Sequence, residues 1–165
     1  MVWYRIVAKN RTTREEILKS NWGRFHDNPE IEPTSYLADS LSTAWREVTA
    51  RFGEVPADPK AFRAWRVTVS GVNLADLTDP EEQSRQQVTS AQILADPPPL
   101  RLKVVARKLR QQEADYHGLI YQSVRNRPGG VCVALFLERV SELIVLEAVE
   151  DEEWGRFIAD EAIGG

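Results

Sequence analysis

Residues 118–136, with the sequence GLIYQSVRNRPGGVCVALF, bring two apolar segments close together along the chain. Both segments are rich in residues that favour β-strands, and a Pro-Gly-Gly turn lies between them at residues 128–130. We therefore predict two neighbouring core strands. A hairpin connection needs only turn residues, whereas this one also contains Ser123, Arg125 and Arg127. We interpret the connection as a corner that faces an anionic ligand.

Further strands and helices are predicted on both sides of this pair. Alternating or apolar patterns predict strands at residues 2–8, 34–38, 62–69 and 142–149, and helices at residues 41–52, 81–94 and 101–114. Residues 9–20 are expected to hold a short turn or helix, and residues 21–33 and 73–79 to be connections. Strands and helices mix without regular βαβ alternation, which favours an α+β fold. We expect one compact domain over residues 1–150, with a mixed or antiparallel sheet and flanking helices, and an acidic tail at residues 151–165.

The composition excludes several classes of protein. A chain of 165 residues is long enough for one domain with a proper core. Its longest apolar run, Val131 to Leu137, is far shorter than the about 20 residues of a membrane span. Arg5 and Lys9 interrupt the N-terminal segment before any signal-peptide core. We therefore expect a cytoplasmic protein without membrane association.

The few cysteines and histidines argue against a metal site. Cys132 is the only cysteine, so no intramolecular disulfide or thiolate cluster is expected. It lies in an apolar strand without a histidine nearby in sequence, and we expect it to be unreactive. His26 and His117 are the only histidines, and neither is assigned a catalytic role.

Charge is unevenly distributed along the chain. Seven Arg or Lys residues lie between Arg101 and Arg127, against two acidic residues. From Ser141 onward eight acidic residues stand against Arg156 alone. Such blocks are commonly two solvated faces, and the alternative is a surface for a partner or ligand. The aromatic residues do not interleave with the basic run, which disfavours direct nucleic-acid binding.

Glu47 is the strongest single candidate for chemistry. Asp39 or Ser40 can cap the helix predicted at residues 41–52, and Glu47 flanks its apolar stripe beside Ala44. The carboxylate can therefore border a cleft. The alternative is a surface ion pair with Arg51, one helical turn later.

Four other residues are candidates by type and position. Arg24 in the loop WGRF can bind a phosphate or carboxylate through two hydrogen bonds, or lie in solvent. Arg5 lies in the first strand, Tyr36 at a strand end and Ser123 in the corner described above. Each is also compatible with an ordinary structural role. No glycine-rich phosphate loop is present, so any nucleotide must be held differently.

In combination these residues resemble the RES domain family of toxins. The matching segments, in family order, are Tyr4-Arg5, the loop WGRF, the segment TSYLADSLSTAWRE and the segment GLIYQSVRNRPGG. The resemblance implies a compact α+β fold related to diphtheria-toxin-like ADP-ribosyltransferases. It also implies NAD as substrate, not as cofactor, and an antitoxin partner with a helix-turn-helix DNA-binding domain. By motif it assigns Glu47, Arg24 and Tyr36 to catalysis, and Arg5, Arg24, Tyr36 and Ser123 to substrate binding, without a metal.

Two activities and one inactive state are compatible with the resemblance. NAD degradation by hydrolysis or phosphorolysis is expected first, and transfer of ADP-ribose to a protein is the alternative. The sequence departs from the family pattern at Trp22, Phe25, His26 and Gln122. Those departures motivate a third hypothesis, a module that binds NAD or an antitoxin without turnover.

Overall fold

The computed structural model describes residues 1–50, 58–111 and 115–164. The strands are β1 (Val2–Ala8), β2 (Thr34–Ala38), β3 (Phe62–Val69), β4 (Leu74–Asp76), β5 (Gly118–Gln122), β6 (Val131–Phe136) and β7 (Ile144–Ala148). The helices are α1 (Arg14–Leu18), α2 (Leu41–Thr49), α3 (Pro80–Gln86), α4 (Ser90–Leu94), α5 (Leu100–Gln111), α6 (Leu137–Val140) and α7 (Asp151–Gly164). Short 3₁₀ helices at Pro59–Ala61 and Ser141–Leu143 precede β3 and β7.

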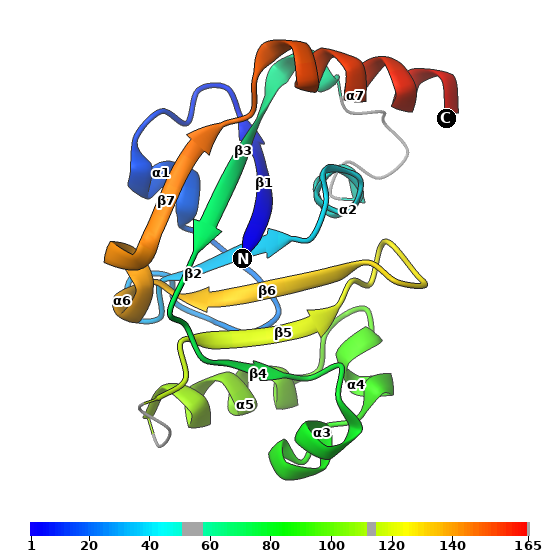
Figure 1. Ribbon diagram of the computed structural model, residues 1–165. Coiled ribbons are helices and arrows are strands. Elements are labelled where there is room, and N and C mark those ends of the chain that lie inside the picture. The colour runs from blue at the N-terminus through cyan, green and yellow to red at the C-terminus, as the bar shows by residue number, and fades with distance from the viewer. Residues whose placement is uncertain (51–57, 112–114, 165) are drawn as a thin grey trace.

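The strands form one sheet that opens in its middle. Its order is β4-β5-β6-β2-β1-β3-β7, and only β4 and β5 run parallel. β1 pairs with β3 along its whole length, from Val2 to Ala8, but with β2 only where Tyr4 faces Ala38. We call this weak junction the seam. It separates a three-stranded half (β1, β3, β7) from a four-stranded half (β2, β6, β5, β4), and the two sets of strands cross in Figure 1.

Alternation along the strands builds a core on each face of the sheet. On β6, Cys132, Ala134 and Phe136 join a cluster that includes buried residues of α2, α4, α5 and α7. Val133 and Leu135 point to the other face, into a smaller cluster. Strands apolar on both sides therefore need helices on both faces. The predicted α+β class with flanking helices is confirmed.

Helix α2 begins where the sequence predicts. The Ser40 side chain accepts a hydrogen bond from the Thr43 backbone amide and so caps the helix. Ala44 and Trp45 are buried on its apolar side. The predicted end at Phe52, and Arg51 as a partner of Glu47, lie outside the described residues.

Two predicted segments differ in the structure. Residues 74–76, expected to be part of a connection, form β4 because they pair with β5. The helix predicted at residues 81–94 is divided into α3 and α4. Gln87 adopts a left-handed conformation with φ of 54° at the end of α3, and Thr89 starts α4 with a capping box.

The acidic C-terminal segment forms helix α7. Its Trp154 is buried in the larger core cluster and contacts Trp45 of α2, with ring centroids 6.1 Å apart. The acidic composition of this segment gave no indication of that contact. Among the described residues no helix is long and apolar enough to span a membrane.

Candidate active site

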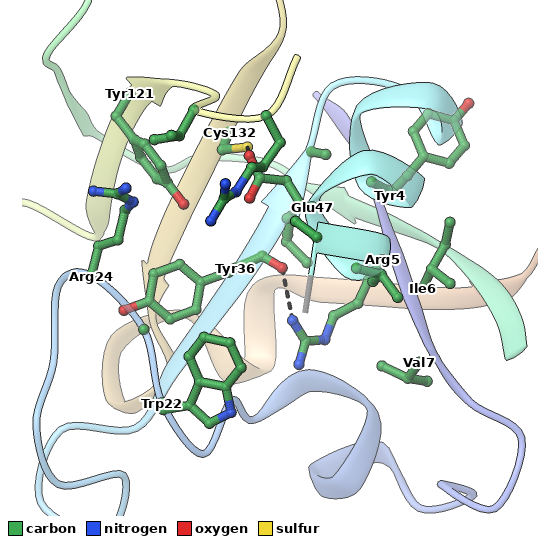
Figure 2. Close-up of a pocket in the computed structure, with 18 of the residues that line it drawn as sticks. Tyr4, Arg5, Ile6, Val7, Trp22, Arg24, Tyr36, Glu47, Tyr121 and Cys132 are labelled. Atoms are coloured by element: carbon green, nitrogen blue, oxygen red, sulfur yellow. Dashed lines mark hydrogen bonds between the residues drawn. The ribbon is translucent and has the colours of Figure 1, made fainter. Parts of the chain in front are cut away.

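A pocket of about 690 Å³ opens at the seam. The three-stranded half supplies Arg5 and several apolar side chains of β1, whereas α2, β2, β5, β6 and the loop at residues 21–33 supply most of the other lining residues. Figure 2 shows Arg24, Tyr36, Glu47 and Tyr121 arranged around the same space. Four of the five predicted residues line it, namely Arg5, Arg24, Tyr36 and Glu47.

Ser123, the fifth, lies fully buried behind Glu47 and not on the pocket surface. Its hydroxyl donates to Glu47 Oε1 over 2.5 Å. The Ser123 hydroxyl oxygen accepts hydrogen bonds from the backbone amides of Arg125, at 3.2 Å, and Asn126, at 3.0 Å. The serine thus holds the carboxylate in place and ties it to the connection between β5 and β6.

That connection is also attached to the start of α2. The Asn126 side chain donates to the Thr43 hydroxyl over 2.8 Å. Thr43 is in turn hydrogen-bonded to Ser40, whose hydroxyl donates to the Thr43 hydroxyl and accepts from the Thr43 backbone amide to cap the helix. The polar residues that interrupt the two strands therefore fasten the loop to the helix that carries Glu47.

Glu47 is half-buried on the side of α2 that faces the pocket, near Ala44 and Val48. The Cys132 thiol lies 3.9 Å from Glu47 Oε1. Burial, reinforced by this carboxylate, raises the pKa of the Cys132 thiol well above its ordinary value. The thiol therefore stays protonated, which agrees with its expected lack of reactivity.

Arg5 bridges the seam. Its guanidinium donates to the Tyr36 carbonyl of β2 over 2.8 Å (Figure 2). It also donates to the Ile17 carbonyl of α1 over 2.6 Å. These contacts replace backbone pairing where β1 and β2 have separated. Arg5 thus has a structural role besides its place in the pocket wall.

Arg24 fixes the loop at residues 21–33 to the end of α4. Its guanidinium donates to the carbonyls of Ala95, at 2.7 Å, and Ile93, at 3.2 Å. Burial lowers the pKa of this side chain, although the nearby Tyr121, Asp96 and Glu47 oppose that effect. An arginine keeps its charge under such a shift, so Arg24 brings a fixed positive charge to the pocket.

Tyr36 is held by the same loop. Its hydroxyl accepts a hydrogen bond from the Phe25 amide at 3.0 Å and lies 2.8 Å from His26 Nδ1. A Cβ atom added at Gly23 would lie 2.2 Å from the Tyr36 ring, so only glycine permits this approach. Burial raises the pKa of the Tyr36 hydroxyl, which therefore stays protonated.

The departures from the family pattern have distinct positions. Trp22 lies on the pocket rim with 58% of its surface exposed. Phe25 is fully buried against Tyr121, with ring centroids 4.9 Å apart. His26 is buried, and burial lowers its pKa. None of these three side chains fills the space beside Glu47.

Positive charge predominates on the pocket wall. The cationic residues are Arg5, Arg11, Arg24, Lys103 and Arg125, and the acidic residues are Asp27, Glu47 and Asp96. This excess favours an anionic ligand. The described residues include no group of three or more His, Cys, Asp or Glu side chains that could hold a metal ion.

The basic run on α5 is largely neutralised within the molecule. Lys103 pairs with Asp27 at 2.7 Å, and Arg107 pairs with both Asp27 and Glu32. Arg101 donates to backbone carbonyls at the end of α3. Most of these charges therefore hold loops against the helix.

Among the pocket residues that the sequence analysis did not assign to the site are Tyr121 and Asp96. Tyr121 belongs to the segment GLIYQSVR, but strand alternation alone does not separate it from an ordinary core tyrosine. Asp96 forms a 2.6 Å ion pair with Arg125 across the rim. Its position after α4 became apparent only from the fold.

A family model, the RES domain, matches residues 2–155. This chain belongs to the RES domain family. Among solved structures, it is similar to the crystal structure of the M. tuberculosis MbcT-MbcA toxin-antitoxin complex, with a TM-score of 0.68 and 18% sequence identity. The similarity covers 94% of this chain and 87% of that chain. A comparison with curated proteins found no significant match. The predicted family and fold class are thus confirmed.

Proposed function

We propose that this RES domain cleaves the bond between nicotinamide and ribose in NAD. The observation that carries the proposal is Glu47, a carboxylate fixed by Ser123 in a pocket that otherwise has an excess of positive charge. NAD has both features that such a pocket suits, an anionic diphosphate and a ribose that becomes positively charged as its bond breaks. It is the substrate in this proposal and no cofactor is required.

The reaction follows from this arrangement. When the bond breaks, nicotinamide leaves with the bonding electron pair, and the ribose acquires the oxocarbenium character known from glycoside cleavage. Glu47 stabilises that charge electrostatically or accepts a hydrogen bond from a ribose hydroxyl. Arg24 and Arg5 contribute positive charge for the diphosphate, and the Tyr36 ring offers a flat surface to the ribose or nicotinamide. Water or phosphate then adds to the ribose carbon and gives up a proton.

The biological role is proposed from the structural neighbour. MbcT-MbcA, to which this chain is similar in structure, is a toxin-antitoxin complex. This chain would act as the toxin, depleting NAD in the cytoplasm. Its partner would be an antitoxin with a helix-turn-helix domain, and the toxin itself would not bind nucleic acid.

NAD consumption by purified protein, with and without phosphate, tests the activity. We expect free nicotinamide with ADP-ribose for hydrolysis, or with a phosphorylated ADP-ribose for phosphorolysis. Glu47→Gln should reduce turnover by a factor on the order of 10²–10³ because the stabilising charge is lost. Glu142→Gln, an exposed glutamate away from the pocket wall, serves as the matched control. Equal turnover by Glu47→Gln and wild type would refute the role of Glu47.

Two other outcomes would redirect the proposal. NAD loss that requires a protein acceptor, with a mass gain on that acceptor, would identify ADP-ribosyl transfer. Thermal stabilisation by NAD without turnover would identify a binding module.

A further inference from the structure

The Tyr121 hydroxyl is a polar group enclosed in the pocket without a strong partner. Tyr121 is only 5% exposed, and its ring packs on Phe25. Figure 2 shows its hydroxyl pointing into the pocket, between Arg24 and Glu47. The Cys132 thiol interacts with this hydroxyl, but sulfur is a weak hydrogen-bonding group. No hydrogen bond joins it to an oxygen or nitrogen atom elsewhere in residues 1–50, 58–111 and 115–164. A hydroxyl that lines a pocket and lacks such a partner can bond a ligand group, so we expect one there.

Ser123 is not available for the same task. Its hydroxyl already donates a hydrogen bond to Glu47 and accepts hydrogen bonds from two backbone amides. It is fully buried and absent from the pocket wall. Ser123 is therefore a positioning residue for Glu47, and contact with substrate passes to another side chain.

We propose that the Tyr121 hydroxyl donates a hydrogen bond to the carboxamide oxygen of the nicotinamide group. This inference rests on the proposed function, because it names the residue that binds the leaving group. The surroundings of the Tyr121 hydroxyl suit a flat, mostly apolar ring, because Ala38, Ala44 and Cys132 line the same pocket. The Glu47 carboxylate instead accepts the hydrogen bonds of the ribose hydroxyls.

The state of the hydroxyl fits a donor. Burial is the largest of the effects that raise the pKa of Tyr121 well above its ordinary value, and Cys132 and Glu47 add to it. The proton is thus retained at neutral pH. As nicotinamide leaves it changes from a cation to a neutral ring, and its carboxamide oxygen becomes a better acceptor. The hydrogen bond therefore strengthens during the reaction and should affect kcat as well as KM.

The test compares Tyr121→Phe with Tyr116→Phe on two substrates, NAD and its thionicotinamide analogue. Tyr116 is the control because its hydroxyl donates to Glu82 and it does not line the pocket. We expect Tyr121→Phe to lower kcat/KM for NAD roughly tenfold, the worth of one hydrogen bond. The decrease in kcat/KM that Tyr121→Phe causes for the analogue should be much smaller, because a thiocarbonyl accepts hydrogen bonds weakly. Comparing both enzymes on both substrates cancels the intrinsic difference between the leaving groups.

A second measurement does not depend on turnover. Saturation-transfer NMR should detect nicotinamide bound to wild type and to Tyr116→Phe, and a much weaker signal with Tyr121→Phe. Thermal denaturation should give Tyr121→Phe a midpoint no lower than that of wild type. If Tyr121→Phe does not fold, wild type should still give a stronger signal with nicotinamide than with thionicotinamide, and equal signals would overturn the inference.

The outcomes separate this inference from the proposed function. Wild-type NAD cleavage with no change in Tyr121→Phe, or with equal losses on both substrates, overturns the inference and leaves the function standing. Absence of NAD cleavage overturns the function. If NAD is not cleaved, nicotinamide binding that is weakened by Tyr121→Phe still supports the proposed nicotinamide subsite. If nicotinamide does not bind, or binds equally well to Tyr121→Phe, the proposed subsite is overturned.

Discussion

The two halves of the sheet differ in regularity and in chemistry. In the three-stranded half, β1 and β3 pair along their whole length, and β3 and β7 pair from Trp65 to Val69. This half gives the pocket an apolar wall and Arg5. In the four-stranded half, the loop before β2, β2 itself and the helix α2 carry Arg24, Tyr36 and Glu47, which are fixed by side-chain hydrogen bonds. Backbone pairing thus provides the scaffold, and individual polar contacts provide the site.

The largest effect is expected where the halves are joined. Arg5→Ala removes two charge-assisted hydrogen bonds to carbonyls on α1 and β2, which should lower the free energy of unfolding by about 3 kcal/mol. Urea denaturation measures this loss. Arg63→Ala, on the exposed side of β3, should change it by less than about 0.5 kcal/mol. Similar midpoints for the two variants would mean that Arg5 does not hold the seam.

Gly23→Ala tests the packing of the loop in the four-stranded half. The new Cβ would overlap the Tyr36 ring, so we expect a loss of about 1–3 kcal/mol in unfolding free energy and weaker NAD turnover. Gly155→Ala is the matched control, because a Cβ there meets open space on α7. That change should raise stability by up to about 1 kcal/mol. Equal effects at both sites would show that the loop moves freely away from Tyr36.

Ser123→Ala separates positioning from substrate binding. The variant leaves two partly buried backbone amides and Glu47 without the serine hydroxyl, and we expect a loss of roughly 1–2 kcal/mol in unfolding free energy. In steady-state kinetics kcat for NAD should fall while KM stays close to that of wild type. Ser84→Ala, on the exposed side of α3, should alter neither. A rise in KM alone would instead place Ser123 in contact with substrate.

His26 makes the stability of this loop dependent on pH. Its pKa is lowered in the folded protein, so as pH falls below the ordinary histidine value of about 6.5 the unfolded chain binds a proton first. The contribution of neutral His26 to the free energy of unfolding is therefore complete above about pH 6.5. It is lost as the pH falls toward the pKa of His26 in the folded protein. His26→Asn should show a smaller decrease in urea midpoint between about pH 7.5 and about pH 5.5. Parallel curves for the two proteins would contradict this account.

The smallest effect is expected at the rim. The ion pair between Asp96 and Arg125 is about half exposed, so Asp96→Asn should change stability by less than about 1 kcal/mol. Because it removes a negative charge and releases Arg125, it should lower KM for NAD by about twofold, and added salt should abolish the difference. A higher KM would show that the ion pair itself shapes the binding site.

Much of the scaffold follows from local patterns. Alternation predicted β1 and β3, an uninterrupted apolar run predicted β6, and capping chemistry with helical spacing predicted the start of α2. β4 was missed because it has only three residues and depends on pairing with β5, which is distant in sequence. The division between α3 and α4 was missed because it depends on a single left-handed residue, Gln87.

Several residues of the candidate site were predicted from the sequence, but their individual positions around the pocket were not. Motif resemblance identified Arg5, Arg24, Tyr36, Glu47 and Ser123, and the fold brings all five together. It did not distinguish Ser123, behind the carboxylate, from Tyr121, on the wall, because the difference depends on the contact of Ser123 with Glu47 of α2, which is distant in sequence. The roles of these residues toward NAD remain predictions.

The contact between Trp154 and Trp45 has a consequence for the order in which the molecule is assembled. Trp45 lies two residues before Glu47 on α2, and Trp154 packs against it from α7. Because chains are synthesised from the N-terminus, every residue of the pocket wall, from Tyr4 to Cys132, exists before Trp154 does. The helix that carries Glu47 therefore gains its contact with Trp154 only when α7 has been synthesised. Until then a nascent chain lacks part of the packing that holds the residue on which its proposed activity depends.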